Sequence, residues 1–447
     1  MTSRRSTPAP SDAPATASDS DDFASARVPA SRSQSTWDIS LVRMGFTVSA
    51  SDLVFGYTVG LYFGFWQAVW ISLLISLIVV VISVGMGMIG VRERLSFALS
   101  TRFAFGREGS RLPSLVMAVV IALFYGYVLG ITVDVFPAAS HPAAQIAYCV
   151  VLGALFVAIS GLGFSRGLKW MGRIGVPLMI LLVIVADVIT VVEAGGFSKI
   201  VSAHPAKAGH MAFLAILGTG IAKWTGGAAV SPDIMRFGKG ARAVWISTAA
   251  EFLLGNFGFN LLGLVLGLGL KSSDLGAAFG LIGLTWLATV AFFFQSVTVE
   301  ANELYAASLS SANAVGLSRR ATNIIVGVVG VVIGYWGLAQ GVIPSFLTFI
   351  GYIGYALPVI PGIMLADYFI VNRMRYATPI GQLPPVNWRA VAAFVVTVAL
   401  NLVTGLVFGD GFWRVLPLFG GVVYLVFSVP QMLAAWRRPA AAPVPAT

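Results

Sequence analysis

Charged residues are scarce in this chain of 447 residues. They make up 10% of it, against about 25% in an ordinary soluble domain, while hydrophobic residues make up 57%. This composition excludes a soluble globular protein and indicates a polytopic membrane protein. The net charge of +10 raises the question of nucleic acid, but no basic stripe with interleaved aromatic residues occurs, because the arginines fall between apolar runs.

Cysteine and histidine are scarce as well. The single cysteine, Cys149, lies in an apolar run, which excludes an intrachain disulfide and a cysteine metal cluster. The three histidines, at positions 141, 204 and 210, are scattered through predicted external loops, so we expect no zinc site. The sequence Gly-x-x-x-x-Gly-Lys-Ser/Thr is absent, so the chain lacks the phosphate-binding loop of an ATP-driven pump.

The chain divides into a polar tail and a long apolar region. Residues 1–36 are rich in Ser, Ala, Pro and Asp and predict a disordered tail rather than a signal peptide. Residues 437–447 form a second tail. Between them we predict an all-α membrane domain, residues 37–436, with apolar spans of about 20 residues as a bilayer requires. The twelve predicted spans are 39–63, 66–90, 113–136, 143–163, 171–193, 211–231, 242–268, 281–308, 322–340, 344–371, 388–408 and 413–435.

The basic residues outside these spans predict the orientation of the chain. Loops on the cytoplasmic side of a membrane carry an excess of Lys and Arg. The loops after even-numbered spans hold Arg92, Arg94, Arg102, Arg107, Arg111, Arg166, Lys169, Arg236, Lys239, Arg319, Arg320, Arg373 and Arg375; those after odd-numbered spans hold only Lys199, Lys207, Lys271 and Arg414. We therefore expect a cell-membrane protein with both termini in the cytoplasm.

Two spans contain interruptions at corresponding places. Span six includes the glycine-rich stretch 218–233, which holds Lys223, and span one includes the polar stretch 45–52. Irregular backbone and a cation at this depth are tolerated where they are buried or line a wet cavity. Broken helices five spans apart predict an inverted-repeat transporter, with repeats at 39–193 and 211–371, a binding site near the midplane, and extra helices at 388–435.

Four motifs in order identify a known family. They are residues 102–114 (RFAFGREGSRLPS), 231–238 (SPDIMRFG), 302–309 (NELYAASL) and 361–368 (PGIMLADY). Together they resemble the nucleobase:cation symport-1 family of cytosine permeases, purine-cytosine permeases and hydantoin transporters, with cytosine permeases the most similar. The resemblance covers residues 38–376.

The resemblance implies a five-plus-five inverted-repeat fold with discontinuous helices one and six. A flat heterocycle would lie between spans one, three, six and eight, and a cation between spans one and eight. Trp224 would stack on the substrate from span six, with Phe124 as its counterpart in span three. Glu300 would take the place of a substrate-binding asparagine, while Gln295 and Thr298 match cation-site positions.

The residues themselves leave alternatives at each of these positions. A carboxylate at the depth of Glu300 costs several kcal/mol unless it is paired or hydrogen-bonded, which favours a functional role over a structural hydrogen bond. Lys223 either neutralises such a carboxylate or extends to the interface, and Asp52 either takes part in the site or caps a half-helix. Trp224 lies beside Gly226 and either stacks on a planar ligand or only packs against neighbouring helices. The same two alternatives apply to Phe124 in its apolar span.

We thus predict a secondary transporter that imports a nucleobase or related heterocycle by cation symport with alternating access, and not an enzyme. Thiamine-precursor pyrimidines, uracil, hydantoin or allantoin are alternative substrates; a channel or an intramembrane enzyme is the rival class.

No cofactor is expected beyond a coupling proton or sodium ion. From the resemblance to cytosine permeases, a second hydroxyl ligand of the cation is expected at the position of Val299, and a glutamine at the position of Ile121. Because valine has no hydroxyl, Val299 favours the proton over sodium as the coupling ion. The predicted substrate residues are Trp224, Phe124, Glu300, Lys223, Gly226 and Ser51; the predicted cation-coupling residues are Ser49, Asp52, Gln295, Thr298 and Asn302, with Ala50, Gln295 and Thr298 as an alternative sodium site.

Overall fold

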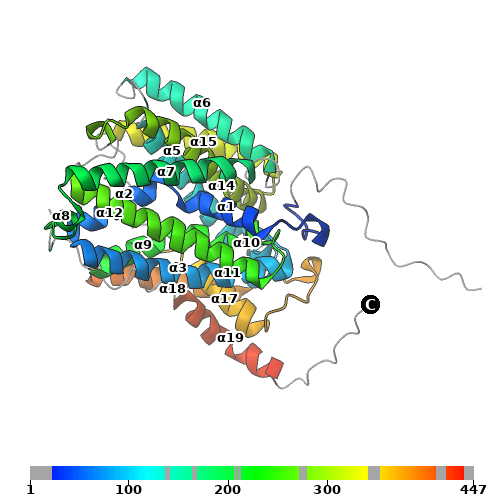
Figure 1. Ribbon diagram of the computed structural model, residues 1–447. Coiled ribbons are helices and arrows are strands. Elements are labelled where there is room, and N and C mark those ends of the chain that lie inside the picture. Colours follow the sequence, from blue (N-terminus) through cyan, green and yellow to red (C-terminus); the bar gives the residue numbers. More distant parts are fainter. Residues whose placement is uncertain are drawn as a thin grey trace, which may run out of the picture.

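The computed structural model describes residues 23–134, 136, 141–163, 169–205, 209, 213–270, 279–340, 353–408 and 419–436. The regular elements in these ranges are all helices. They form a bundle with α6 along one side and α17, α18 and α19 along the opposite side (Figure 1).

Each of the twelve predicted spans contains helix. Single helices form spans two to five, eight, nine, eleven and twelve: α3 (Phe65–Glu93), α5 (Arg111–Asp134), α6 (Pro142–Gly161), α7 (Lys169–Glu193), α14 (Thr285–Val315), α15 (Arg319–Gln340), α18 (Trp388–Phe408) and α19 (Gly420–Trp436). Span ten contains α17 (Val359–Leu365), which continues as the π-helix η5 (Ala366–Val371); residues 344–352 lie outside the described ranges. Short helices lie in the connections: η2 (Ala30–Arg32), α4 (Phe97–Phe105), α8 (Phe197–Val201) and η6 (Ile380–Gln382).

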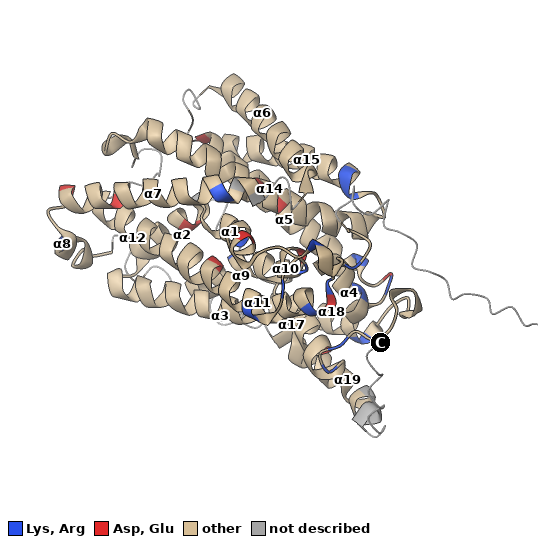
Figure 2. Cartoon of the chain, turned by 45° about the vertical axis from the view of Figure 1, so that its right-hand side comes forward, with Lys and Arg blue, Asp and Glu red and all other residues tan. Residues whose placement is uncertain are grey.

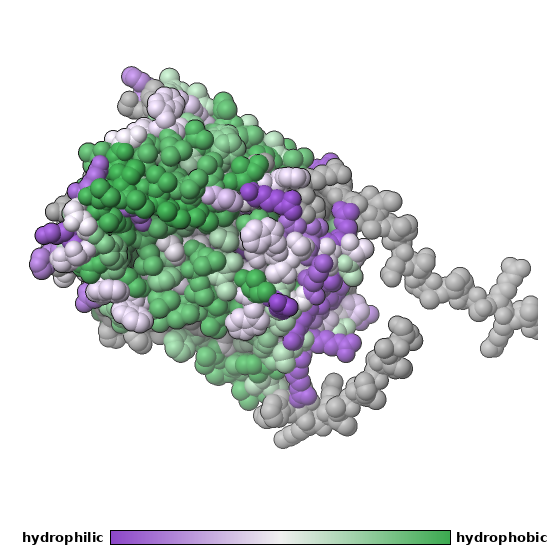
Figure 3. Space-filling model, in the orientation of Figure 1, coloured by the Kyte–Doolittle hydropathy of each residue, from purple (hydrophilic) through white to green (hydrophobic). Residues whose placement is uncertain are grey.

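Length and composition mark most of these helices as membrane spans. Eight described helices are long and apolar enough to cross a bilayer, and the bent first span would make a ninth. Helix α14 falls below this standard because it carries buried polar and acidic side chains along its middle. On the face shown in Figure 3, hydrophobic residues cover the middle, and hydrophilic residues gather towards the two ends. Figure 2 shows most of the Lys and Arg residues at the end where α4 lies.

Span one is broken where the sequence predicts it. Helix α1 (Thr36–Thr47) ends before Val48, and α2 (Ala50–Tyr62) begins after Ser49, whose φ of −136° and ψ of 154° are extended. The two halves are bent by 51°. The break therefore places the non-helical backbone of Val48 and Ser49 inside the bundle, where both residues are buried.

Span six is broken within the predicted stretch 218–233, towards its end. The glycines around Lys223 are not the place of the break, because α9 (Phe213–Ala229) runs through them as a continuous helix. The helix ends at Val230, and α10 (Ser231–Met235) follows. The glycines serve packing instead, since a Cβ at Gly220 would lie 2.3 Å from Ile75 on α3. Close approach to a neighbouring helix, rather than a break, accounts for this run of small residues.

Span seven holds an irregularity that the sequence analysis does not predict. It consists of α11 (Ala241–Ala249), the π-helix η4 (Ala250–Phe257) and α12 (Gly258–Leu270). In η4, the carboxylate of Glu251 pairs with the fully buried guanidinium of Arg43 from α1. The same guanidinium donates to the hydroxyls of Ser83 and Ser231, at 2.6 and 3.2 Å. This buried cluster ties spans one, two, six and seven together.

The helix contacts follow the symmetry expected of two related halves. Helix α2 packs against α12, and α3 packs against α9, so span one contacts span seven as span two contacts span six. Likewise α5 packs against α15, and α14 against α6. If spans one to five are exchanged with spans six to ten, the contact of span one with span seven becomes the contact of span six with span two. In the same way, the contact of span three with span nine becomes the contact of span eight with span four. The packing agrees with an inverted repeat that is invisible as a direct sequence repeat.

Residues 23–35 are ordered, although they fall in the predicted disordered tail. Phe23 and Val28 are buried, and the carbonyl of Phe23 accepts a hydrogen bond from Arg236 at 3.0 Å. Arg27 pairs with Glu93 at 2.9 Å. These few apolar and basic residues contact the bundle. The average composition of residues 1–36 does not reveal such individual contacts. Residues 1–22 and 437–447, the rest of the predicted tails, lie outside the described ranges.

Candidate functional site

A buried ion pair joins the two interrupted spans. The ammonium of Lys223 on α9 lies 2.6 Å from Oδ1 of Asp52 in the first turn of α2 and donates to the carbonyl of Ser51 at 3.1 Å. Both side chains are almost completely enclosed, with exposed fractions of 1% for Lys223 and 0% for Asp52. The alternative in which Lys223 extends to the membrane interface is therefore wrong.

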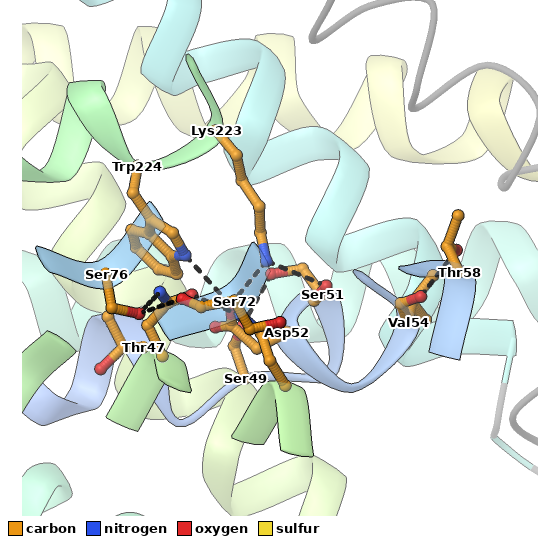
Figure 4. Close-up of polar contacts among 12 residues, drawn as sticks. Thr47, Ser49, Ser51, Asp52, Val54, Thr58, Ser72, Ser76, Lys223 and Trp224 are labelled. Carbon is orange, nitrogen blue, oxygen red and sulfur yellow. Dashed lines mark hydrogen bonds and ion pairs between the residues drawn. The ribbon is translucent and has the colours of Figure 1, made fainter. Parts of the chain in front are cut away.

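The carboxylate of Asp52 is the centre of a wider network (Figure 4). Its Oδ1 also accepts from the indole nitrogen of Trp224 at 3.0 Å, and its Oδ2 accepts from the hydroxyl of Ser49 at 2.9 Å. The Ser49 and Ser51 hydroxyls lie 2.8 Å apart. A carboxylate at a helix N-terminus is also favoured by the helix dipole, so the break in span one prepares a place for this negative charge.

Aromatic rings surround the ammonium group. The nitrogen of Lys223 lies 5.0 Å from the ring centre of Phe55 and 5.3 Å from that of Trp224. Cation–π contacts of this kind stabilise a desolvated cation. Trp224 in turn meets Phe252 edge to face, with ring centres 6.0 Å apart. The indole is thus fixed by one hydrogen bond and two ring contacts.

A narrow pocket opens beside this network. Its lining residues come from α1, α2, α5, α9 and α14, with Val230 from the break in span six: Phe46, Ser51, Val120, Ile121, Phe124, Lys223, Trp224, Gly226, Gly227, Val230 and Glu303. Water-sized molecules can occupy about 30 Å³ of it, which is room for roughly two waters. A planar ring therefore requires the walls to move apart.

The pocket brings together five of the six predicted substrate residues. Trp224, Phe124, Lys223, Gly226 and Ser51 all line it. At the neighbouring Gly227, a Cβ would lie 3.2 Å from the indole of Trp224, so glycine lets the ring lie against its own helix. The wall is apolar apart from the Ser51, Lys223, Trp224 and Glu303 side chains.

Glu300, the sixth predicted substrate residue, does not line this pocket. It is fully buried, and neither carboxyl oxygen has a hydrogen-bond partner among the described residues. Its electrostatic neighbours are Glu303 on the same helix and Tyr125 on α5. Glu303 lines the pocket in its place, one helical turn further along α14. The i, i+3 spacing of two glutamates in a buried span is the signal that could have found it.

Comparisons with known proteins decide the family. Residues 28–429 match the family described as permeases for cytosine/purines, uracil, thiamine and allantoin. This chain belongs to that permease family. The cytosine permease of Escherichia coli K12 is 26% identical over 394 residues, which cover 87% of this chain and 90% of that protein. The cytosine permease of Escherichia coli O157:H7 matches to the same extent.

Solved structures of transporters share the fold of this permease. Mhp1, a nucleobase-cation-symport-1 family transporter in a closed conformation with bromovinylhydantoin bound, gives a TM-score of 0.72 at 18% identity and covers 91% of this chain and 94% of that chain. A Na⁺-coupled sialic acid symporter, in a substrate-bound outward-open state, gives 0.67 at 13% identity and covers 94% and 92%. The predicted family and the predicted helical transporter fold are confirmed, and the chain is a permease rather than an enzyme.

The predicted cation residues of the permease fall into two groups. Ser49 and Asp52 belong to the network around Lys223, as described above. On α14, the amide of Asn302 donates to the carbonyl of Val42 on α1 at 3.1 Å. A Cβ at Gly45 of α1 would lie 2.5 Å from the methyl carbon of Thr298, so this side chain touches α1 closely.

The rest of the predicted sodium site has few oxygens. The amide of Gln295 is buried without a hydrogen-bond partner among the described residues. Val299 packs in an apolar cluster with Met44, Val48 and Phe259. Ala50 begins α2, and its side chain lies outside the described part. Groups of three or more His, Cys, Asp or Glu side chains that could hold a metal ion do not occur in the described ranges.

Proposed function

We propose that this permease imports a nucleobase or a related flat heterocycle by alternating access, and that the pocket between α1, α2, α5, α9 and α14 is its substrate site. The observation that carries the proposal is the presence of Trp224 and Phe124 in one pocket, whose wall is otherwise apolar apart from the side chains of Ser51, Lys223 and Glu303. Planar rings are held by stacking on aromatic side chains. The cytosine permeases among its relatives make cytosine the first substrate to test.

The other heterocycles named for the family remain alternatives in this proposal. Uracil, allantoin and thiamine-related pyrimidines are of similar size and shape. Hydantoins are a further alternative, since Mhp1 was solved with a hydantoin bound. All of them could stack on Trp224, so the polar groups of the pocket must decide between them.

We infer that a proton, rather than sodium, is the coupling ion. The ammonium of Lys223 lies within hydrogen-bonding distance of Asp52 and of the Ser51 carbonyl, at the break in span one. These are oxygens that a sodium ion would need, and Val299 offers none. Buried carboxyls in membrane spans commonly serve as proton carriers, and Asp52, Glu300 and Glu303 are such carboxyls.

The orientation of the permease follows from its basic loops. Arg92, Arg94, Arg107, Arg111 and Lys239 all belong to loops after even-numbered spans. Cytoplasmic loops carry this excess, so we place both termini in the cytoplasm of a cell with the permease in its plasma membrane.

Uptake into proteoliposomes tests the function and the coupling ion separately. Purified permease is reconstituted, and uptake of labelled cytosine is followed under an imposed pH gradient or an imposed sodium gradient. We expect accumulation that follows the pH gradient and collapses with a proton ionophore. Accumulation driven by sodium alone would overturn proton coupling, and a solute flux that never exceeds equilibration would indicate a channel. Competition by unlabelled heterocycles then ranks the substrates, and absence of both uptake and competition would overturn the proposed function.

A further inference from the structure

Glu303 is the polar side chain of the pocket whose bonding is incomplete. The Lys223 ammonium, the Trp224 indole nitrogen and the Ser51 hydroxyl all have partners in the network around Asp52. In contrast, Oε2 of Glu303 has no hydrogen-bond partner among the described residues. A buried carboxyl oxygen left without a partner costs free energy, so native structures seldom keep one without a purpose.

Glu303 also differs from its neighbour Glu300 in exposure. The exposed fraction is 9% for Glu303 and 0% for Glu300, and only Glu303 lines the pocket. Glu303 is the single contribution of α14 to the described pocket wall, whereas Phe124 and Trp224 come from α5 and α9, and Phe46 comes from α1. A ring held by Trp224 and Phe124 would therefore meet a carboxyl from a third helix.

No described charged group forms an ion pair with Glu303. Its electrostatic neighbours are Glu300 on the same helix and Tyr125 on α5, and Tyr125 in turn interacts with Cys149 of α6. Lys223 of α9 shares the pocket, but its ammonium is held by Asp52. An unpaired charge in such a place is costly, whereas a carboxyl that carries a proton is a neutral donor and acceptor.

We propose that Glu303 binds the substrate by sharing one proton with it, across an edge where a ring nitrogen stands next to an amino group. This inference rests on the proposed function and specifies the substrate class of the same pocket. A protonated carboxyl donates its O–H to the ring nitrogen and accepts an N–H from the amino group through its other oxygen. Two parallel hydrogen bonds then satisfy both oxygens of Glu303.

The proton comes from the outer solution and leaves with the substrate on the inner side. It lies between an oxygen of Glu303 and the ring nitrogen, so no bond other than those to this proton changes. The nitrogen of an aminopyrimidine is a much stronger proton acceptor than the carbonyl oxygen of an imide. Aminopyrimidines and aminopurines should therefore bind better than imides of the same ring, such as uracil. Substrate binding and proton binding become one event at one side chain.

The variant Glu303→Gln separates the two parts of this proposal, which are substrate binding and proton binding. The side chain in Glu303→Gln carries a fixed N–H donor and a carbonyl acceptor, and so imitates the protonated carboxyl without exchanging a proton. Glu303→Ala removes both groups. Glu108→Gln is the matched control, because Glu108 is an exposed glutamate in the connection between α4 and α5, where it pairs with Arg111.

The experiment measures cytosine binding to the full-length permease in detergent by titration calorimetry, in two buffers of different ionisation enthalpy, at an alkaline pH at which Glu303 of the free permease is ionised. Wild type and Glu108→Gln should take up about one proton per cytosine bound, and their affinity should fall as the pH rises. Glu303→Gln should keep the affinity within a few-fold, take up no proton and show a flat pH profile. Glu303→Ala should bind roughly tenfold to a hundredfold more weakly. Uracil should bind wild type more weakly than cytosine does.

Several results would overturn the proposal. They are unchanged affinity in Glu303→Ala, unchanged proton uptake in Glu303→Gln, or wild type that prefers uracil to cytosine; in each case the permease function itself would stand. Wild type that binds no heterocycle at all would instead refute the proposed function. Monodisperse elution and the thermal unfolding of each variant are measured first, and the near-isosteric Glu303→Gln variant carries the test if Glu303→Ala does not fold.

Discussion

Among mutations at the centre of this permease, those that break the ion pair between Asp52 and Lys223 should lower the free energy of unfolding the most. In Lys223→Met, the methylene stem is largely kept, while the carboxylate of Asp52 loses a partner at 2.6 Å in a place without solvent. Breaking a buried pair by removing one member costs about 3–5 kcal/mol. This corresponds to a change of roughly a hundred-fold to several thousand-fold in the unfolding equilibrium.

The double variant Asp52→Asn/Lys223→Met provides the internal test of this reasoning. With both charges removed, no buried charge lacks a partner, so most of the lost free energy should return. The free energies of unfolding are measured by denaturant titration in mixed micelles, followed by tryptophan fluorescence. Lys239→Met, at an exposed lysine in the loop after α10, is the matched control and should change little. If the two single losses simply add in the double variant, the pair does not stabilise the permease as argued.

Three further outcomes follow from neighbouring contacts. Trp224→Ala should weaken cytosine binding by about tenfold or more, since stacking on an aromatic ring contributes about 1–3 kcal/mol; competition binding measures it, and Trp224→Phe should retain most of the affinity. Gly175→Ala should destabilise the packing of α7 on α14, because a Cβ there would lie 2.4 Å from the hydroxyl of Thr298; thermal unfolding measures it, and an unchanged midpoint would contradict it. Arg236→Gln should release residues 23–35, because this fully buried guanidinium holds the Phe23 carbonyl and, at 2.7 Å, the Tyr305 hydroxyl; hydrogen exchange in the N-terminal segment should rise, and unchanged protection would refute the link.

The helical nature of the spans and the break in span one could be predicted from local properties. Apolar length alone indicates a helix that crosses a bilayer. The break at Val48 and Ser49 lies in the predicted polar stretch 45–52, which supplies Ser49 as the N-cap residue of the second half-helix and Asp52 in its first turn. Local sequence and final structure agree there because the same residues both end one helix and begin the next.

The break in span six falls within the predicted stretch 218–233, but its position there could not be located in this way. Glycine lowers the helix propensity of α9, but burial against α3 outweighs this loss, so the helix continues past Lys223 to Ala229. Glu303 was likewise not predicted from the sequence, which pointed to Glu300. Both lie on one side of α14, and the rotation of the helix against α5 decides which carboxyl reaches the pocket. That rotation depends on packing between helices that are far apart in the chain.

The same packing indicates which parts of the permease move together. Separation of α2 from α9 would leave Asp52 and Lys223 without partners, and separation of α1 from η4 would do the same to Arg43 and Glu251. Both events are costly, so spans one, two, six and seven should move as one body.

The pocket lies between this body and the helices α5 and α14, whose described contribution to its wall is apolar apart from Glu303. No described ion pair crosses the pocket, so opening it leaves the buried charges of Asp52, Lys223, Arg43 and Glu251 paired. The carboxyl that we propose to carry the coupling proton thus stands on one wall, and the stacking indole of Trp224 on the other. A bound heterocycle that contacts both would draw the walls together only when the proton is present, which is the condition for coupled transport.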